Sequence, residues 1–475
     1  MMGRFMAGFM VSAAWRSSGK TTVACGLAAT LARRELAVQP FKKGPDFIDP
    51  QWLSVAAGRP CRNLDIHLQG ALGVDEYWRR HAGSAEVALI EGNMGLHDGL
   101  ALDGSDSNAT LARRLGVPVV LVLDARGTGR GAAALLLGLA GFDPQVRIAG
   151  VILNRLGGAR HEAKLRAAIE AYTPLEVLGA IGEDPKLAIV ERHLGLVPAN
   201  EAADAQARVR ALADRIESGV NVAAILAAAA GASPLAEPAA QRSSAPPAGG
   251  PRIGIPRDLA FGFYYPDDLE ALQEAGAVLV PFDTLADARL PDVDALFIGG
   301  GFPETLAAEL EANAALRGEI RAAVERGLPV YAECGGLMYL ARSITMGGRT
   351  HRMAGAIPAD VVMHRKPVGK GYVTLAETTG HPWAGGGPVQ AHEFHYSSLE
   401  NVDPGVRYAY RVMRGHGIDG ERDGLVHRNV LASYAHQRSV GGNDWARRFV
   451  AYVRRMKAAA AEVAAARPVE EEAQP

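Results

Sequence analysis

One cysteine stands where an apolar strand passes into a glycine-rich helix start, in residues 329–337, PVYAECGGL. Cys334 ends the apolar run, and Gly335 and Gly336 follow it before a helical pattern begins. A sharp strand-to-helix turn of this kind holds a nucleophile exposed and leaves backbone N–H groups free to bind an oxyanion. The segment therefore predicts an α/β fold with a thiol nucleophile at the end of a strand.

Both halves of the chain alternate short apolar runs with helical patterns. We expect strands in the first half at residues 9–14, 38–41, 87–90, 117–123 and 148–153, with helices after Lys20, Asn108 and Gly131. The second half has runs at residues 252–255, 278–281, 295–298 and 329–332, and becomes strand-rich at 371–376, 408–413 and 430–434. This alternation predicts two α/β domains with parallel sheets, in which sites gather at the carboxyl ends of strands.

A stretch rich in Ala, Pro, Ser and Gly divides the 475-residue chain near its middle. Residues 232–251 contain almost no large apolar side chains, which is typical of a linker. We therefore expect one domain at residues 1–231 and a second at 252–455. Residues 456–475, Ala-rich and then acidic, are expected to be a tail that combines a fraying helix end with disorder.

Composition excludes some classes of function. The net charge is −2 and the pI about 6.7, which favours neither nucleic acid nor an anionic membrane as a partner. No apolar run reaches transmembrane length, and residues 5–14 are expected to form a buried strand. Three scattered cysteines provide no disulfide or zinc framework, so we expect a cytoplasmic protein.

The segment S-G-K-T-T at residues 18–22 resembles a phosphate-binding loop. Gly19, Lys20 and Thr21 fit the end of the G-x-x-x-x-G-K-[ST] pattern and Thr22 follows them, whereas Ala14 replaces the first glycine of the pattern. In such a loop the backbone N–H groups and the lysine bind phosphates, and the threonine holds Mg²⁺. The alternative is a tight turn that caps a helix.

Two motifs that follow strands supply four carboxylates. Residues 42–50, KKGPDFIDP, contain Asp46 and Asp49, and residues 91–99, EGNMGLHDG, contain Glu91 and Asp98. Nucleotide-bound Mg²⁺ needs only one or two carboxylates, so the others are candidates to orient a second substrate. Each acidic residue taken alone could instead be a solvated turn or a helix cap.

The thiol of Cys334 needs a base. His436 ends the apolar run at residues 430–434 and is the first candidate, and His392 and His395 compete with it. The H-x-x-H spacing of the last two is a poor metal motif on a strand, because their side chains point to opposite faces.

Taken together, these motifs resemble the cobyrinic acid a,c-diamide synthase family of glutamine-dependent tetrapyrrole amidotransferases. The resemblance rests on GPDFIDP at 44–50, GRPCRNLD at 58–65 and EGNMGLHDG at 91–99, and it spans roughly residues 8–440. It implies an N-terminal P-loop domain like that of dethiobiotin synthetase and a C-terminal class I glutamine amidotransferase domain.

The resemblance also implies roles in the ATP half. Lys20, Thr21, Asp46 and Glu91 match positions that serve phosphate and Mg²⁺. Asp49 and Asp98 match positions near the acyl acceptor. Asn154 matches an asparagine that recognises adenine, although it could be a turn residue at a strand end.

In the glutaminase half, the resemblance selects His436 as the base, in A-S-Y-A-H at residues 432–436. The loop G-G-G-F-P-E at 299–304 then supplies the oxyanion hole through Gly300 and Gly301, together with Gly335; the alternative is a plain turn. The glutamate that class I domains usually carry two residues after the histidine is absent, because residue 438 is arginine.

The activity implied is amidation of the a and c acetate carboxylates of a tetrapyrrole, driven by ATP and Mg²⁺ with glutamine as nitrogen donor. Departures at residues 13–16 and 51–53 resemble a branch that amidates sirohaem, and Trp52 could stack on a flat ring or pack in the core. A P-loop switch ATPase with a non-catalytic partner-binding domain is the alternative. The oligomeric state stays open, with a homodimer as one option.

Overall fold

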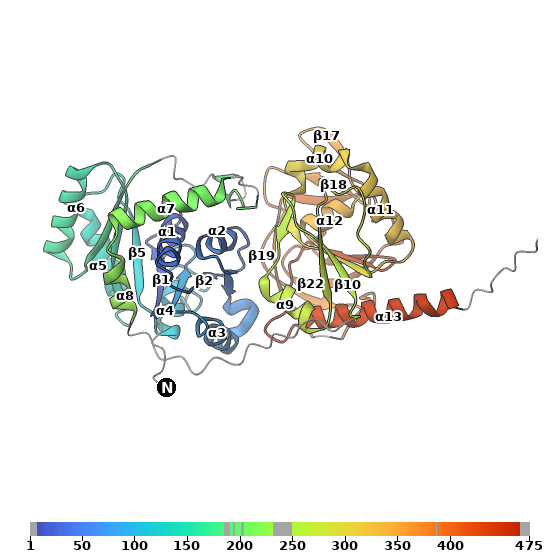
Figure 1. Ribbon diagram of the computed structural model, residues 1–475, viewed down its shortest axis with the longest axis horizontal. Helices are drawn as coiled ribbons and strands as arrows, with labels where there is room; N and C mark the ends of the chain where they lie inside the picture. The colour runs from blue at the N-terminus through green and yellow to red at the C-terminus, as the bar shows by residue number, and fades with distance from the viewer. Residues whose placement is uncertain are drawn as a thin grey trace, which may run out of the picture. The chain divides into compact units, whose positions relative to one another are not determined.

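The computed structural model describes residues 7–184, 191–192, 195–200, 204–230, 249–385 and 387–465. The chain divides into two compact units, Met1–Arg242 and Ser243–Pro475, each of which has its own cores (Figure 1). Most of the predicted linker at 232–251 lies outside the described residues. The α/β class predicted for both halves is confirmed.

The N-terminal unit is built on a seven-stranded sheet in which every neighbouring pair is parallel. Its strands read as apolar runs because helices cover both faces. In spatial order the strands are β3 (Arg62–Leu64), β2 (Val38–Lys43), β4 (Val87–Glu91), β1 (Ala7–Ala13), β5 (Val119–Asp124), β6 (Ile148–Leu156) and β7 (Val177–Gly182). The strands β3 and β7 were not among those predicted from the sequence.

The helices of this unit form one layer on each face of the sheet (Figure 1). The first layer contains α1 (Lys20–Arg33), α2 (Ile48–Ala57), α7 (Ala205–Gly219) and α8 (Val222–Ala229). The second contains α3 (Ile66–Ala82), α4 (Asn108–Leu115), α5 (Gly131–Phe142) and α6 (Ala159–Tyr172). A short pair, β8 (Glu191–Arg192) and β9 (Gly195–Leu196), completes the described elements of the unit.

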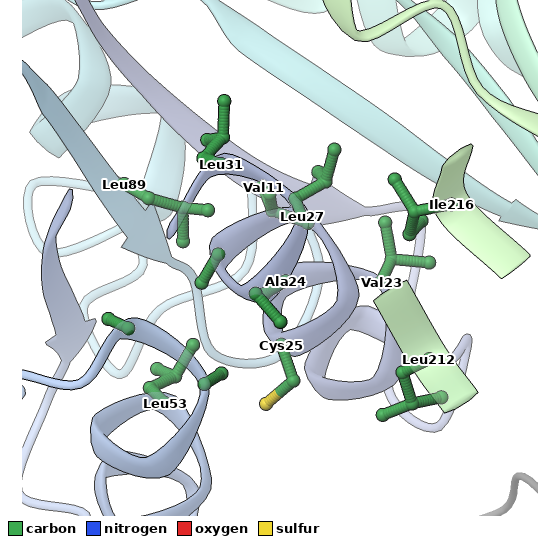
Figure 2. Close-up of a cluster of buried hydrophobic side chains, with 14 of the residues drawn as sticks. Val11, Val23, Ala24, Cys25, Leu27, Leu31, Leu53, Leu89, Leu212 and Ile216 are labelled. Carbon is green, nitrogen blue, oxygen red and sulfur yellow. The ribbon is translucent and has the colours of Figure 1, made fainter. Parts of the chain in front are cut away.

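Helix α1 lies at the centre of the first layer. Leu27 is fully buried in the cluster that contains Val11 of β1 and Leu53 of α2 (Figure 2). Leu212 and Ile216 of α7 close the cluster on the side of α1 away from the sheet. Burial on so many sides fixes the N-terminus of α1, which carries the phosphate-loop residues.

The C-terminal unit is built on a nine-stranded mixed sheet. Its first five strands are parallel and the rest are antiparallel. In spatial order they are β12 (Val278–Phe282), β10 (Arg252–Pro256), β13 (Ala295–Ile298), β15 (Val330–Glu333), β24 (Val430–Ser433), β23 (Arg422–His427), β22 (Arg407–Arg414), β19 (Gly369–Glu377) and β20 (Val389–His395). The switch from parallel to antiparallel pairing occurs at β24.

Further elements cover the two faces of this sheet (Figure 1). On one face lie α10 (Ala307–Ala312), α11 (Ala314–Glu325) and α12 (Gly335–Leu340), with the 3-10 turn η2 (Pro303–Leu306). On the other lie α9 (Pro266–Glu274) and α13 (Trp445–Ala465). Two small sheets pair β11 (Phe261–Phe263) with β14 (Gly300–Gly301), and β17 (Arg349–Arg352), β16 (Ser343–Met346), β18 (Asp360–Met363) and β21 (Ser397–Glu400).

Helix α13 corrects the boundary at residue 456. It continues without a break to Ala465, so the helical part of the predicted tail belongs to the C-terminal unit. The Ala-rich segment has high helix propensity and extends a helix whose first turns are already packed in the core. Within the described residues, no helix is both long and apolar enough to span a bilayer.

Gly26 marks the closest approach of α1 to α7. A Cβ at this position would lie 2.6 Å from Ile216 Cγ1 and 3.0 Å from the carbonyl oxygen of Leu212. Gly26→Ala should therefore destabilise the N-terminal unit by about 1–3 kcal/mol, because overpacking outweighs the helix-propensity gain of about 0.5–1 kcal/mol. Hydrogen exchange of the β1 amides measures the change in the N-terminal unit alone.

The matched control is Gly138→Ala in α5, where an added Cβ meets nothing within 4 Å. Propensity alone acts there, so this variant should be stabilised by about 0.5–1 kcal/mol. Equal stabilisation of both variants would contradict the close α1–α7 contact.

Candidate functional site

Cys334 sits on a strained turn between β15 and α12. Its φ is 49° and its ψ is −103°, in a region that non-glycine residues rarely adopt. The backbone N–H of Cys334 donates to the Ser433 carbonyl at 2.7 Å, which holds the turn against β24. Strain of this kind costs about 1–3 kcal/mol and persists where surrounding contacts over-determine the conformation. The result is a thiol at the carboxyl end of a central parallel strand, as the sequence predicts.

Strand pairing brings His436 to the same place. Glu333, the last residue of β15, is in register with Ser433, and His436 follows three positions later. The backbone of His436 exchanges two hydrogen bonds with His392, at 2.7 and 3.1 Å. A Cβ on Gly300 would lie 2.6 Å from His436 Cε1, so the imidazole packs directly on that glycine. His436 is thus fixed beside Cys334, and the thiol contributes to raising the pKa of the imidazole.

A carboxylate that the sequence analysis did not select completes this group. Glu333 Oε2 lies 3.3 Å from His436 Nδ1, and both side chains are almost fully buried. Burial lowers the pKa of His436, but hydrogen bonds and charges from Cys334 and Glu333 outweigh burial and raise that pKa to about 10. The one signal in the sequence was an acidic residue directly before the cysteine, at the end of an apolar strand.

The predicted glycines surround the thiol. Gly300 and Gly301 form β14, which pairs with β11, and Phe302 N donates to Ala260 O at 3.0 Å. A Cβ on Gly335 would lie 2.9 Å from the backbone nitrogen and oxygen of Gly301. The two segments therefore touch without side chains between them, beside both Cys334 and His436.

The other two candidate histidines have different surroundings. His395 stacks on Tyr434, with ring centroids 3.8 Å apart, and its Nδ1 bonds the carbonyl of Ser397 at 2.8 Å. Burial lowers the pKa of His392 to about 3. Within the described residues, no three His, Cys, Asp or Glu side chains are grouped so that they could hold a metal ion by themselves.

In the N-terminal unit, the loop before α1 is held by the end of β6. Asn154 Nδ2 donates to Ser18 O at 2.9 Å, and Arg155 Nη1 donates to Ser17 O at 2.6 Å. Gly19 has φ 86°, and a Cβ there would collide with the Asn154 amide. Asn154 therefore binds the phosphate loop itself, and Arg155 was not selected from the sequence.

Lys20 and Thr21 open α1 and turn toward the strand ends, while Thr22 is half-buried in the same turn. Lys20 Nζ donates to the carbonyl of Trp15 at 3.2 Å, so the ammonium group is hydrogen-bonded to the backbone of the phosphate loop. Burial and the charge of Lys42 lower the pKa of Lys20 to about 8. Thr21 Oγ1 donates to Glu91 Oε1 at 2.6 Å.

The ammonium group of Lys42 lies within 4 Å of three of the four predicted carboxylates. Its Nζ lies 2.5 Å from Asp49 Oδ2, 3.1 Å from Glu91 Oε1 and 3.9 Å from Asp46 Oδ2. Burial raises the pKa of Asp46 and that of Glu91 to about 7 each, and the Asp49 charge adds to both shifts. Lys42 was not among the predicted site residues, although its position in the motif that carries Asp46 and Asp49 was a signal.

The fourth carboxylate, Asp98, lies in the loop after β4. Its Oδ2 accepts from Gly95 N at 3.0 Å, and its charge acts on Lys20. Gly95 packs against the carbonyl of Ala14 so closely that a Cβ would collide with it. Asp98 is therefore placed at the edge of the phosphate loop, apart from the Lys42 cluster.

Trp52 corrects the stacking hypothesis. It is 1% exposed within the core between α1 and α2, and its indole N–H donates to Val197 O at 2.8 Å. The core alternative is the right one for Trp52, and its ring cannot meet a macrocycle. Trp15, in contrast, is 42% exposed on the phosphate loop.

Comparison with known families covers both units. Residues 16–197 match the CobQ/CobB/MinD/ParA nucleotide binding domain, and residues 252–443 match the CobB/CobQ-like glutamine amidotransferase domain. Among solved structures, PurLQS from Thermotoga maritima covers 44% of this chain and 99% of its own, at 18% identity and a TM-score of 0.33, too low to argue from.

Curated relatives align over almost the whole chain. The cobyrinate a,c-diamide synthase of Magnetococcus marinus is 48% identical, over 92% of this chain and 95% of the relative. That of Methanosarcina acetivorans is 42% identical over 92% and 93%, and that of Listeria innocua is 37% identical over 90% and 95%. The chain therefore belongs to the cobyrinate a,c-diamide synthase family, with a nucleotide-binding domain and a glutamine amidotransferase domain in one polypeptide.

Proposed function

We propose that this protein is a glutamine-dependent ligase that amidates the a and c acetate carboxylates of a cobyrinate-type tetrapyrrole at the expense of ATP. This proposal rests mainly on the presence of two sites in one chain. In the C-terminal unit the strained Cys334 turn lies beside His436. In the N-terminal unit Lys20, Thr21 and Glu91 lie together. Two reactions, release of ammonia and activation of a carboxylate, then occur in one chain. The full-length similarity to cobyrinate a,c-diamide synthases supports this assignment.

The C-terminal unit releases ammonia from glutamine. The Cys334 thiolate attacks the amide carbon, and the developing oxyanion is bound by backbone N–H groups of Gly301 and Gly335. His436 then gives its proton to the departing nitrogen, so that ammonia leaves and a thioester remains. Water, deprotonated by His436, attacks the thioester, which releases glutamate and restores the thiol.

The N-terminal unit binds the nucleotide and the carboxylate to be activated. Lys20 and the backbone around Gly19 suit the phosphates, and the lysine would exchange the Trp15 carbonyl for a phosphate oxygen. The γ-phosphoryl group passes to the substrate carboxylate, and ammonia then displaces phosphate from the acyl phosphate to form the amide. Asp49, which pairs with Lys42, and Asp98, at the edge of the phosphate loop, are the two residues that we propose to meet the acceptor.

Thr21, Asp46 and Glu91 fit a Mg²⁺ ion that arrives with the nucleotide. Glu91 Oε2 is buried and has no hydrogen-bond partner within the described part of the chain, while Oε1 holds the Thr21 hydroxyl. A buried carboxylate oxygen of this kind beside a loop hydroxyl is a suitable ligand for a divalent cation. When bound, the ion neutralises charge on the transferring phosphoryl group.

Cobyrinate is preferred over sirohaem as the acceptor for a structural reason. Trp52, the residue whose ring favoured a flat sirohaem-type macrocycle, is packed in the core. The relatives with full-length similarity are named for cobyrinate.

Replacing Cys334 by serine separates the two reactions. Glutamine-dependent amidation should fall by at least about 10³-fold, because the hydroxyl is a much weaker nucleophile beside this histidine. Amidation with high ammonium should persist at close to the wild-type rate. Product formation measured by mass spectrometry with each nitrogen donor tests both expectations.

If a folded Cys334→Ser variant lost amidation with ammonia as well, the assignment of separate sites would be wrong. If glutamine-dependent amidation were unchanged, Cys334 would not be the nucleophile. A switch ATPase with a non-catalytic C-terminal unit would show no glutaminase activity even in the wild type.

Replacing Lys20 by alanine tests the nucleotide site. Amidation should fall by about 10²-fold or more with either nitrogen donor, because a cation that stabilises phosphoryl charge is lost. Glutamine hydrolysis, measured as glutamate release, should remain. Lys164→Ala, which removes an exposed lysine of α6, is the control and should change neither rate. Unchanged ATP turnover in Lys20→Ala would rule out this role for Lys20.

A further inference from the structure

The residue directly before the nucleophile carries a carboxylate that faces the catalytic histidine. Glu333 Oε2 lies 3.3 Å from His436 Nδ1, and the exposed fractions of the two side chains are 3% and 5%. Glu333 Oε1 accepts from Tyr331 Oη at 2.7 Å and from the backbone N–H of Gln437 at 2.9 Å. These contacts fix the carboxylate in place, so its approach to the imidazole is part of the folded core.

Tyr331 and Gln437 are themselves held from behind. Gln437 Nε2 donates to Tyr331 Oη at 3.0 Å and to Tyr410 Oη at 2.7 Å. Asn443 Nδ2 in turn donates to Gln437 Oε1 at 3.2 Å. A buried polar network that is satisfied in this way is rigid, which suits a group whose task is to hold an imidazole in one orientation.

Position 438, where class I domains usually carry the orienting glutamate, has a different role in this chain. Arg438 Nε donates to Asp267 Oδ2 at 2.7 Å, and its guanidinium lies over the Tyr265 ring, 5.0 Å from the centroid. The side chain is fully buried on α9. Residue 438 therefore carries a cation that pairs with Asp267 and not with His436.

We propose that Glu333 is the positioning residue of the glutaminase, and that it orients the His436 ring and holds its proton in place of the missing glutamate. Since Nδ1 faces Glu333, the other ring nitrogen, Nε2, is left to meet the Cys334 thiol. An imidazole whose Nδ1–H is held by a carboxylate has a fixed tautomer and a stabilised protonated form. The nucleophile and the orienting carboxylate are thus consecutive residues. Both of these roles depend on the proposed glutaminase function.

Pairing of β15 with β24 explains how consecutive residues can serve one histidine. Glu333 points to the same face of β15 as Tyr331, which is two residues earlier in the strand. The left-handed turn at Cys334 then redirects the chain, so that the thiol and the carboxylate both approach His436. Two hydrogen bonds hold the end of β15 next to the end of β24. The backbone N–H of Cys334 donates to the Ser433 carbonyl, and the backbone N–H of Gln437 donates to the Glu333 carboxylate.

Three other titratable groups surround this pair. His392, on β20, is kept neutral because burial lowers its pKa to about 3, and the positive charge of His436 adds to that shift. Burial and the neighbouring charges of Asp267 and Glu333 raise the pKa of Asp268 well above its usual range. Burial also raises the pKa of the Tyr331 phenol. At neutral pH the His436 charge is therefore governed by Glu333 and Cys334.

The test is the charge-removing variant Glu333→Gln, in which the amide oxygen can still accept from Tyr331 and from Gln437 N–H. The first readout is the ¹⁵N NMR titration of His436 in the full-length protein without substrates. In the wild type the ring should stay protonated through neutral pH, because its pKa is raised. In Glu333→Gln that pKa should fall, and the ring should lose its proton in or below the neutral range.

The kinetic readout is glutamine hydrolysis. Glu333→Gln should lower kcat by about 10²- to 10⁴-fold with a smaller change in KM, since Glu333 does not touch the substrate. Alkylation of Cys334 by iodoacetamide should also slow at neutral pH and recover as pH rises. Amidation with ammonia should be retained, because it needs only the N-terminal unit's site.

Two further variants distinguish positioning from a merely structural role. Glu333→Asp keeps the charge but withdraws it by one methylene, so its His436 titration should stay raised and its glutaminase rate should lie between wild type and Glu333→Gln. Asp423→Asn is the matched buried control: Asp423 is fully buried and bonds Ser433 Oγ and the backbone of Tyr434 and Ala435 instead of the histidine. It should leave the His436 titration unmoved.

A wild-type His436 titration in Glu333→Gln would overturn the proposal. So would equal loss of rate in Glu333→Asp and Glu333→Gln with normal titrations in both, which would indicate a structural role. The titration is independent of the proposed function: if Cys334→Ser kept glutamine-dependent amidation, the glutaminase assignment would fail, while the titration would still report on the Glu333–His436 pair.

Discussion

Parallel strand pairing at the centre of each sheet is the constraint on which both sites depend. In the N-terminal unit, β1 lies between β4 and β5, so the loop after β1 meets the carboxylates after β2 and β4. In the C-terminal unit, β15 lies between β13 and β24, so the Cys334 turn meets the glycine loop after β13 and the histidine after β24. Parallel strands end at the same edge of a sheet, which assembles each site from distant segments.

The two sites deal with buried charge in different ways. In the glutaminase site the positive charge of His436 is compensated by the Glu333 carboxylate and the Cys334 thiol beside it. In the nucleotide site Lys42 is surrounded by three carboxylates, and burial raises the pKa of Asp46 and Glu91. Ionised groups out of water are costly unless paired, and a bound divalent cation reverses the local balance that raises carboxylate pKa values. The first site is complete by itself, whereas the second is suited to a nucleotide with its metal ion.

Much of this arrangement could be predicted from the sequence, because apolar runs followed by glycines, lysine, cysteine or histidine mark strand ends. The strands that precede Lys20, Cys334 and His436, and the strand that ends at Glu91, are of this kind. Glu333 was not identified, because its contact with His436 depends on the register of β15 with β24 and on the path of the chain after Ser433. Lys42 and Lys43 are adjacent in sequence, but alternation on β2 gives them different partners, Asp49 and Asn93. The position of Trp52 was equally open, since a helical tryptophan beside a site can face the core or the substrate.

The most direct test of the account follows the amide nitrogen of glutamine. The wild-type protein is supplied with ATP, Mg²⁺ and glutamine labelled with ¹⁵N in the side-chain amide, with cobyrinate in one reaction and sirohaem in another, and the macrocycles are analysed by mass spectrometry. The account predicts ¹⁵N in the a and c amides of cobyrinate, formed with a higher kcat/KM than any sirohaem product. Glutamate release and ATP hydrolysis without labelled nitrogen in either macrocycle would contradict it.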